Sequence, residues 1–168
     1  DQLADLHIKQ GRPQQAEAAF VRVKNIRLAA FGPGSAEAAA AFSNLGNLYL
    51  ELKRFVDAEP FLKQALIWRQ IALDEPAHPD VVQSMADLGT LYLFQERYTD
   101  AEAYLKQAVD LRQAGADADT EAFATLLNYL GTLYVKQDRF AQAIPVCERA
   151  LAIDEKILGK DHPEIATD

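Results

Sequence analysis

One five-residue motif occurs three times in this 168-residue chain, at nearly equal intervals. Each copy reads Leu-Gly-x-Leu-Tyr, and its glycines, Gly46, Gly89 and Gly131, are separated by 43 and then 42 residues. An alanine follows each copy at a fixed distance, and Ala16 stands 42 residues before the first of these alanines. A period of about 20–50 residues is typical of stacked supersecondary units. The chain is therefore predicted to be an array of three complete units and a partial one.

Each unit is predicted to contain two antiparallel helices. Large apolar residues recur at intervals of three and four, as in Phe42, Leu45 and Tyr49, which is the period of one helical face. A second apolar run with helical spacing follows in every unit, for example from Phe55 to Trp68. Since stacked helical units share one core and present a long surface, the construction favours binding over chemistry.

The units are expected to form a single array over residues 1–168. Their boundaries are 1–34 for the partial unit, then 35–77, 78–119 and 120–161, and residues 162–168 look like the start of a further helix. The chain opens in the middle of a repeat and closes as another begins, so we interpret it as a piece of a longer polypeptide.

The glycines of the motif lie inside the first helix of each unit, where glycine costs about 1 kcal/mol relative to alanine. A cost that recurs at one place implies a recurring compensation. We expect the second helix, which brings Ala58, Ala101 or Ala143 to the same level, to approach too closely for a β-carbon. The arginines in the turns between helices are interpreted as solvated.

The net charge of −8 makes nucleic acid an unexpected partner, because a phosphate backbone requires a basic face. The apolar runs are far shorter than the roughly 20 residues that span a bilayer, so no membrane segment is expected. The single cysteine, Cys147, cannot form an intramolecular disulfide, and the missing disulfide framework favours a cytoplasmic location.

The pattern Leu-Gly-x-x-Tyr followed by Ala-x-x-x-large resembles the tetratricopeptide repeat. The 42-residue unit, together with Asn44-Leu45-Gly46 and the run from Leu158 to Pro163, is similar to the longer variety found in kinesin light chains. The resemblance covers essentially the whole chain and implies an all-α, right-handed superhelical solenoid of antiparallel helix pairs. The chain departs from the pattern at Ala4 and His7, which replace a glycine and a tyrosine.

In the resembled family, a second stripe on the first helices lines a concave groove that holds extended peptides or helices. The stripe supplies apolar contact and groups that bond a peptide backbone, and its low charge favours apolar or neutral partners. The carboxylate-clamp variety needs basic residues here, and only Lys9 and Lys136 stand at the edge of the stripe. The expected peptide-binding residues are Ile8, Ser43, Asn47, Leu50, Thr90, Leu93, Phe94, Asn128, Thr132 and Val135. The stripe could instead merely touch the neighbouring repeat or be covered by a further helix.

No catalytic residues, cofactor or metal ligands are expected. His78 and His162 lie two repeats apart, too far to share a metal. Cys147 stands where other units have large apolar residues, so a buried thiol is expected. The sequence has no phosphate-binding loop or Cys-x-x-Cys pair.

The predicted function is therefore that of a non-enzymatic scaffold that binds a protein or peptide segment in its concave groove. Two alternatives stay open. The array could be a regulatory or assembly module of a larger enzyme or signalling protein. It could also associate with itself, because the unpaired face of a terminal repeat is apolar.

Overall fold

The computed structural model describes residues 2–113 and 120–158, and within these ranges α-helices joined by short turns and loops make up the chain, with no strand. The expected start of a further helix at 162–168 lies outside the described residues. The helices are α1 (Gln2–Lys9), α2 (Pro13–Phe31), α3 (Ala36–Glu51), α4 (Phe55–Leu73), α5 (Pro79–Phe94), α6 (Tyr98–Gln113), α7 (Glu121–Lys136) and α8 (Phe140–Leu158). The predicted all-α fold is confirmed.

The first helices of the complete units begin at side-chain caps. Ser35 Oγ accepts a hydrogen bond from the Ala38 N–H at 3.2 Å, and Thr120 Oγ1 accepts one from the Phe123 N–H at 3.3 Å. His78 caps α5 through Nδ1, ahead of a proline in the first turn. Such caps satisfy N–H groups that have no partner inside the helix, which explains where these helices start.

Three residues join the two helices of each unit, and the middle one adopts a left-handed backbone. Gly11, with φ of 66°, occupies this place in the first unit. The equivalent residues in the later units are Lys53, Glu96 and Asp138, with φ of 57°, 60° and 58°. Because left-handed backbone is costly for a residue with a β-carbon, three of the four turns are strained.

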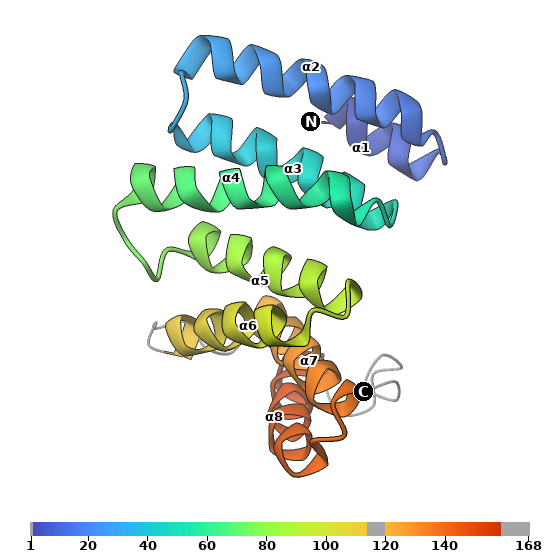
Figure 1. Cartoon of the computed structure of the whole chain (residues 1–168), viewed down its shortest axis with the longest axis vertical. Helices are drawn as coiled ribbons and strands as arrows, with labels where there is room; N and C mark the ends of the chain where they lie inside the picture. The colour runs from blue at the N-terminus through green and yellow to red at the C-terminus, as the bar shows by residue number, and fades with distance from the viewer. Residues whose placement is uncertain (1, 114–119, 159–168) are drawn as a thin grey trace.

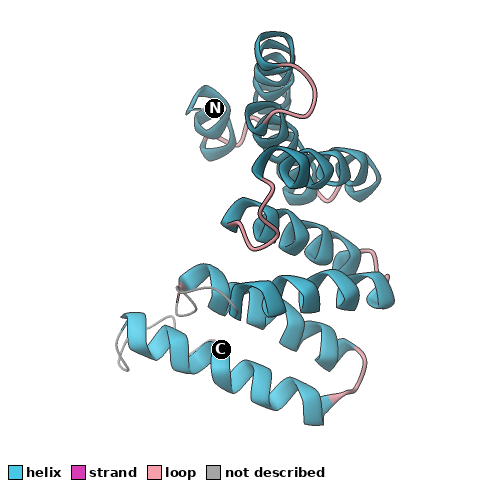
Figure 2. Ribbon diagram, turned by 90° about the vertical axis from the view of Figure 1, so that its left-hand side faces the viewer, coloured by secondary structure: helices cyan, strands magenta, loops and turns pink. Residues whose placement is uncertain are grey.

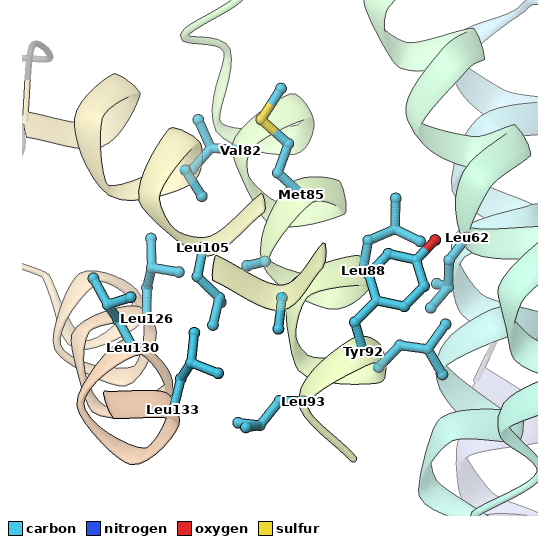
Figure 3. Packing of buried hydrophobic residues seen from close by; sticks show 14 of the residues in the cluster. Leu62, Val82, Met85, Leu88, Tyr92, Leu93, Leu105, Leu126, Leu130 and Leu133 are labelled. Carbon is cyan, nitrogen blue, oxygen red and sulfur yellow. The ribbon is translucent and has the colours of Figure 1, made fainter. Parts of the chain in front are cut away.

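The helices stack in chain order, as Figures 1 and 2 show. Each helix packs against the next one in the sequence, and α3 also contacts α5, which in turn contacts α7. The first helices of successive units therefore line one side of the stack. One hydrophobic core runs from Ala4 in α1 to Ile153 in α8, and Figure 3 shows its part around α5.

The helix pairs approach closely at the motif glycines, as predicted, but the neighbour is a different residue. A β-carbon on Gly46 or Gly89 would lie 2.6 Å from the side chain and 3.3 Å from the backbone nitrogen of Leu62 or Leu105. On Gly131 it would lie 2.5 Å from Cys147 Sγ. The contact therefore falls four residues beyond the expected alanine.

One further expectation is wrong, because Cys147 is half-buried rather than buried. The arginines of the later turns are exposed or half-buried, as expected, and each also reaches back to a glutamate of the preceding unit. Arg54 Nη1 lies 2.7 Å from Glu17 Oε2, and the same contact joins Arg97 to Glu59 and Arg139 to Glu102.

A tyrosine completes each of these bridges between units. The guanidinium of Arg54 lies 4.4 Å from the centre of the Tyr49 ring, and the Tyr49 hydroxyl donates to Glu17 at 2.8 Å. Burial and the hydrogen bond to Glu17 raise the pKa of Tyr49 to about 12. Arg97 stacks on Tyr92 and Arg139 on Tyr134 in the same way. The bridges therefore recur with the repeat and join each unit to the preceding one.

Candidate functional site

The side of the stack formed by α3, α5 and α7 is hollowed by a central pocket of about 430 Å³. The amino-terminal half of α7 forms one wall and the carboxyl-terminal half of α3 forms the other, with α5 between them. Its lining combines small apolar, amide, hydroxyl and acidic side chains. These are Asn47, Leu50, Glu51, Gln83, Ala86, Asp87, Thr90, Ala122, Thr125, Leu126 and Tyr129.

A smaller pocket adjoins each end of the central one. Towards the end of α5, a pocket of about 290 Å³ is lined by Leu50, Glu51, Lys53, Phe55, Thr90, Phe94 and Tyr129. Towards the start of α5, a pocket of about 200 Å³ is lined by Pro79, Asp80, Val82, Gln83, Ala86, Arg112, Ala122, Phe123 and Leu126. Because each shares four lining residues with the central pocket, the three pockets lie side by side along α5, and together they are here called the groove.

Asp87 forms the floor of the central pocket. Its carboxylate accepts hydrogen bonds from Gln83 Nε2 at 2.8 Å, from Asn47 Nδ2 at 3.2 Å and from Ser43 Oγ at 3.5 Å. The side chain is only 8% exposed, and burial raises its pKa. Burying a carboxylate is costly unless hydrogen bonds and opposite charge offset the lost hydration. Here all three donors are neutral.

The apolar end of the groove is built on aromatic rings. Phe55 and Phe94 stack with their ring centres 6.0 Å apart and their planes 15° apart. Phe94 is nevertheless 53% exposed, so much of its ring is available to a partner. Tyr129 reaches both this pocket and the central one.

The structure brings four of the expected binding residues together in the groove, namely Asn47, Leu50, Thr90 and Phe94. Ser43 is buried beneath the groove, where it hydrogen-bonds to Asp87. Leu93, next to Phe94, is 5% exposed and belongs to the hydrophobic core, where Figure 3 shows it among the side chains between α5 and α7.

The remaining expected residues do not line the three pockets. Ile8 is half-buried against the core of the first unit. The others lie on α7, where Asn128 is half-buried while Thr132 and Val135 are exposed. The part of α7 that meets the groove is instead the face of Thr125 and Tyr129. The groove residues absent from the expected set include the polar side chains of Glu51, Gln83, Asp87, Thr125 and Tyr129.

The expected residues of α7 miss the groove because α3 and α7 pack on opposite sides of α5 and therefore present different faces to it. α3 faces α5 with the side of Asn47 and Leu50, whereas α7 faces α5 with the side of Thr125 and Tyr129. A signal was present, because Asn44, Asp87 and Tyr129 precede the Leu-Gly of each motif. These three residues occupy the same position of the repeat but differ in chemistry. That difference could have indicated that the position shapes the surface of each unit rather than its core.

Neither a metal-binding cluster nor a membrane-spanning helix occurs in the described part of the chain. Residues 2–113 and 120–158 contain no group of three or more His, Cys, Asp or Glu side chains suited to a metal ion. None of the helices that the structure describes is long and apolar enough to cross a membrane.

Two family models, both described as tetratricopeptide repeat, match the chain. The first matches residues 1–66 and 69–114, and the second matches residues 123–164. Together they cover most of the sequence. The chain belongs to the tetratricopeptide repeat family, whose arrays are generally protein–protein interaction scaffolds.

Among solved structures, the chain is similar to BtubC (BKLC) from P. vanneervenii, with a TM-score of 0.82 and 24% identity over 96% of this chain. This chain spans 63% of the length of BtubC. It also resembles a candidate kinesin light chain of Podosopora anserina with nearly identical TPR-like repeats, with a TM-score of 0.83 and 19% identity. That match covers 99% of this chain and 78% of the other.

A variant of the Podosopora anserina protein matches equally well, with a TM-score of 0.84 and 20% identity over the same shares of the two chains. At these identities the likeness establishes the fold, a tetratricopeptide solenoid of the kinesin-light-chain type. No curated protein gives a significant match to the sequence.

Proposed function

We propose that this chain is a non-enzymatic scaffold that holds an extended segment of a partner protein in the groove. The observation that carries the proposal is the row of three adjoining pockets along α5, with α3 and α7 on either side. A row of pockets suits a peptide, because successive side chains of an extended segment can enter successive pockets.

The chemistry of the lining supports an extended occupant. Gln83, Thr125 and Tyr129 place amide and hydroxyl groups along the central pocket, where they can exchange hydrogen bonds with a peptide backbone. The pocket of Leu50, Phe55 and Phe94 can bury an apolar side chain. Full burial of such a side chain is worth about 1.5–3 kcal/mol, which makes this pocket the main source of affinity.

The test is a selection of random peptides by display on the purified chain, followed by binding measurements with the selected peptides. We expect Phe94→Asp to abolish binding, because an aspartate in the apolar pocket cannot be desolvated cheaply. Leu93 is left unchanged, since it belongs to the core.

Ile67→Asp is the matched control. Ile67 lies on α4, outside the groove, and is 49% exposed, close to the 53% of Phe94. The control should bind the selected peptides like the parent chain, and both variants should melt like it. If a folded Phe94→Asp variant keeps full affinity, the groove is not the binding site.

A further inference from the structure

We infer that the central pocket of the groove is a subsite for a positively charged side chain, a lysine or an arginine, of the bound segment. The inference rests on the proposed function and adds to it the chemistry of the bound segment. The partner would be a basic peptide segment that carries an apolar side chain close to its cation.

The charge of the central pocket favours a cation. Two acidic side chains, Glu51 and Asp87, line this pocket, and none of the described residues that line it is basic. The flanking pockets have mixed charge, because Lys53 lies with Glu51 at one end of the groove and Arg112 lies with Asp80 at the other. A cation is therefore best placed in the middle of the groove, where the acidic lining has no basic counterpart.

In the described part of the chain, no basic side chain hydrogen-bonds to the Asp87 carboxylate or forms an ion pair with it. Arg69, which is buried and lowers the pKa of Asp87 through its charge, directs Nη1 elsewhere. That nitrogen donates to Ser84 Oγ at 2.7 Å and to the carbonyl of Asp80 at 3.0 Å. A buried carboxylate held only by neutral donors gains from a charged donor, because charge-assisted hydrogen bonds are about twice as strong as neutral ones.

An unused hydrogen-bond acceptor belongs to the same amide that donates to the carboxylate. Asn47 donates to Asp87 through Nδ2, and its other amide atom, Oδ1, is buried without a hydrogen-bond partner in the described structure. Buried polar groups without partners are rare and costly. A guanidinium or ammonium group carries several N–H donors. A cation that reaches Asp87 can therefore also donate a hydrogen bond to Asn47 Oδ1 after a small rotation of the amide.

Glu51 places a second carboxylate at the edge of the central pocket. It is exposed at the rim and lines both the central and the apolar pocket. The aliphatic stem of a lysine or arginine could cover apolar surface near Leu50 while its charged end passes Glu51 to reach Asp87. An acidic side chain in the same place would face two like charges and be rejected.

The experiment uses peptides selected on the unmodified chain. We expect selection to enrich lysine or arginine beside a large apolar residue. Replacing the enriched arginine by citrulline, its neutral isostere, should weaken binding by about tenfold, as expected for loss of a charge-assisted hydrogen bond. Replacing it by glutamate should weaken binding further.

The same peptides are then measured against Asp87→Asn, Glu51→Gln and the double variant. The double variant should bind the arginine and citrulline peptides with nearly equal affinity, because the charge that distinguishes them is gone. Glu37→Gln, on the exposed start of α3, is the control and should preserve the difference. Glu51 is exposed, so Glu51→Gln alone gives a readable partial loss even if a buried substitution at Asp87 disturbs folding.

Two outcomes would overturn the inference. Selection could enrich acidic or uncharged peptides, or the preference for arginine over citrulline could persist in the folded double variant. If these peptides still fail to bind Phe94→Asp, only the cation subsite is refuted and groove binding stands. If no selected peptide is sensitive to Phe94→Asp, the proposed function fails and the inference fails with it.

Discussion

The substitution of alanine for Gly89 or Gly131 tests how closely the two helices of a unit approach. Both glycines lie inside a first helix, where alanine is better than glycine by about 1 kcal/mol. If nothing else mattered, both variants would be more stable than the parent chain. The structure predicts opposite results for the two positions.

At Gly89 the new β-carbon would lie 2.6 Å from Leu105 Cγ and 3.3 Å from the Leu105 backbone nitrogen. The leucine is fully buried and the backbone cannot move without the helix, so overpacking should cost about 1–3 kcal/mol. This exceeds the gain in helix propensity. Gly89→Ala is expected to lower the free energy of unfolding by about 1 kcal/mol, and Gly89→Leu by several.

At Gly131, among the described residues outside the glycine's own helical turns, the new β-carbon would meet Cys147 Sγ, the end of a short, half-buried side chain rather than backbone. Gly131→Ala should therefore keep most of the propensity gain and be about 0.5–1 kcal/mol more stable. Urea unfolding followed by circular dichroism measures both variants. Equal stabilisation by the two alanines, or an unchanged melting curve for Gly89→Leu, would refute the close contact.

Three other substitutions test the remaining physical claims. Asp87→Asn should stabilise the chain at about pH 7.5. Burial raises the folded-state pKa of Asp87, so the fold favours the protonated side chain. The stability that protonated Asp87 contributes is present at low pH and is lost as pH rises through the folded-state pKa. The advantage of the variant in urea unfolding should shrink as pH falls towards about 4, and a constant advantage would contradict the assignment. Glu96→Gly should raise the free energy of unfolding by about 0.5–1 kcal/mol, because the left-handed backbone at φ of 60° favours glycine; a loss of stability would show that the turn is not strained. Glu102→Gln should lower the melting temperature at low salt and less so at high salt, because it weakens the bridge to Arg139, whose hydrogen bonds lower the pKa of Glu102. A salt-independent effect would mean that the bridge is not electrostatic.

The repeat made most of the fold predictable. The Leu-Gly-x-Leu-Tyr motif placed the first helices, and helical periodicity placed the second ones, because apolar spacing reports directly which face is buried. The bridges between units were missed, since nothing in the sequence pairs Arg54 with Glu17 across 37 positions. That pairing depends on how one unit sits on the next.

The groove was predictable only in part. Leu93 and Phe94 are neighbours in one stripe, yet one is core and the other is exposed, because successive helical residues point about 100° apart and the core boundary falls between them. Asp87 was missed because an acidic residue in a helix is expected to be solvated. Its burial results from the packing of α3 beside α5, which local sequence does not specify.

Photocrosslinking from the groove tests the central claim most directly. Benzoylphenylalanine replaces Tyr129 in the groove, or Gln107 on the exposed side of α6 as the control, and each protein is irradiated with a selected peptide. The account predicts efficient crosslinking from position 129, suppressed by Phe94→Asp, and little from position 107. Crosslinking from position 107 in preference to position 129 would place the partner outside the groove and contradict the account.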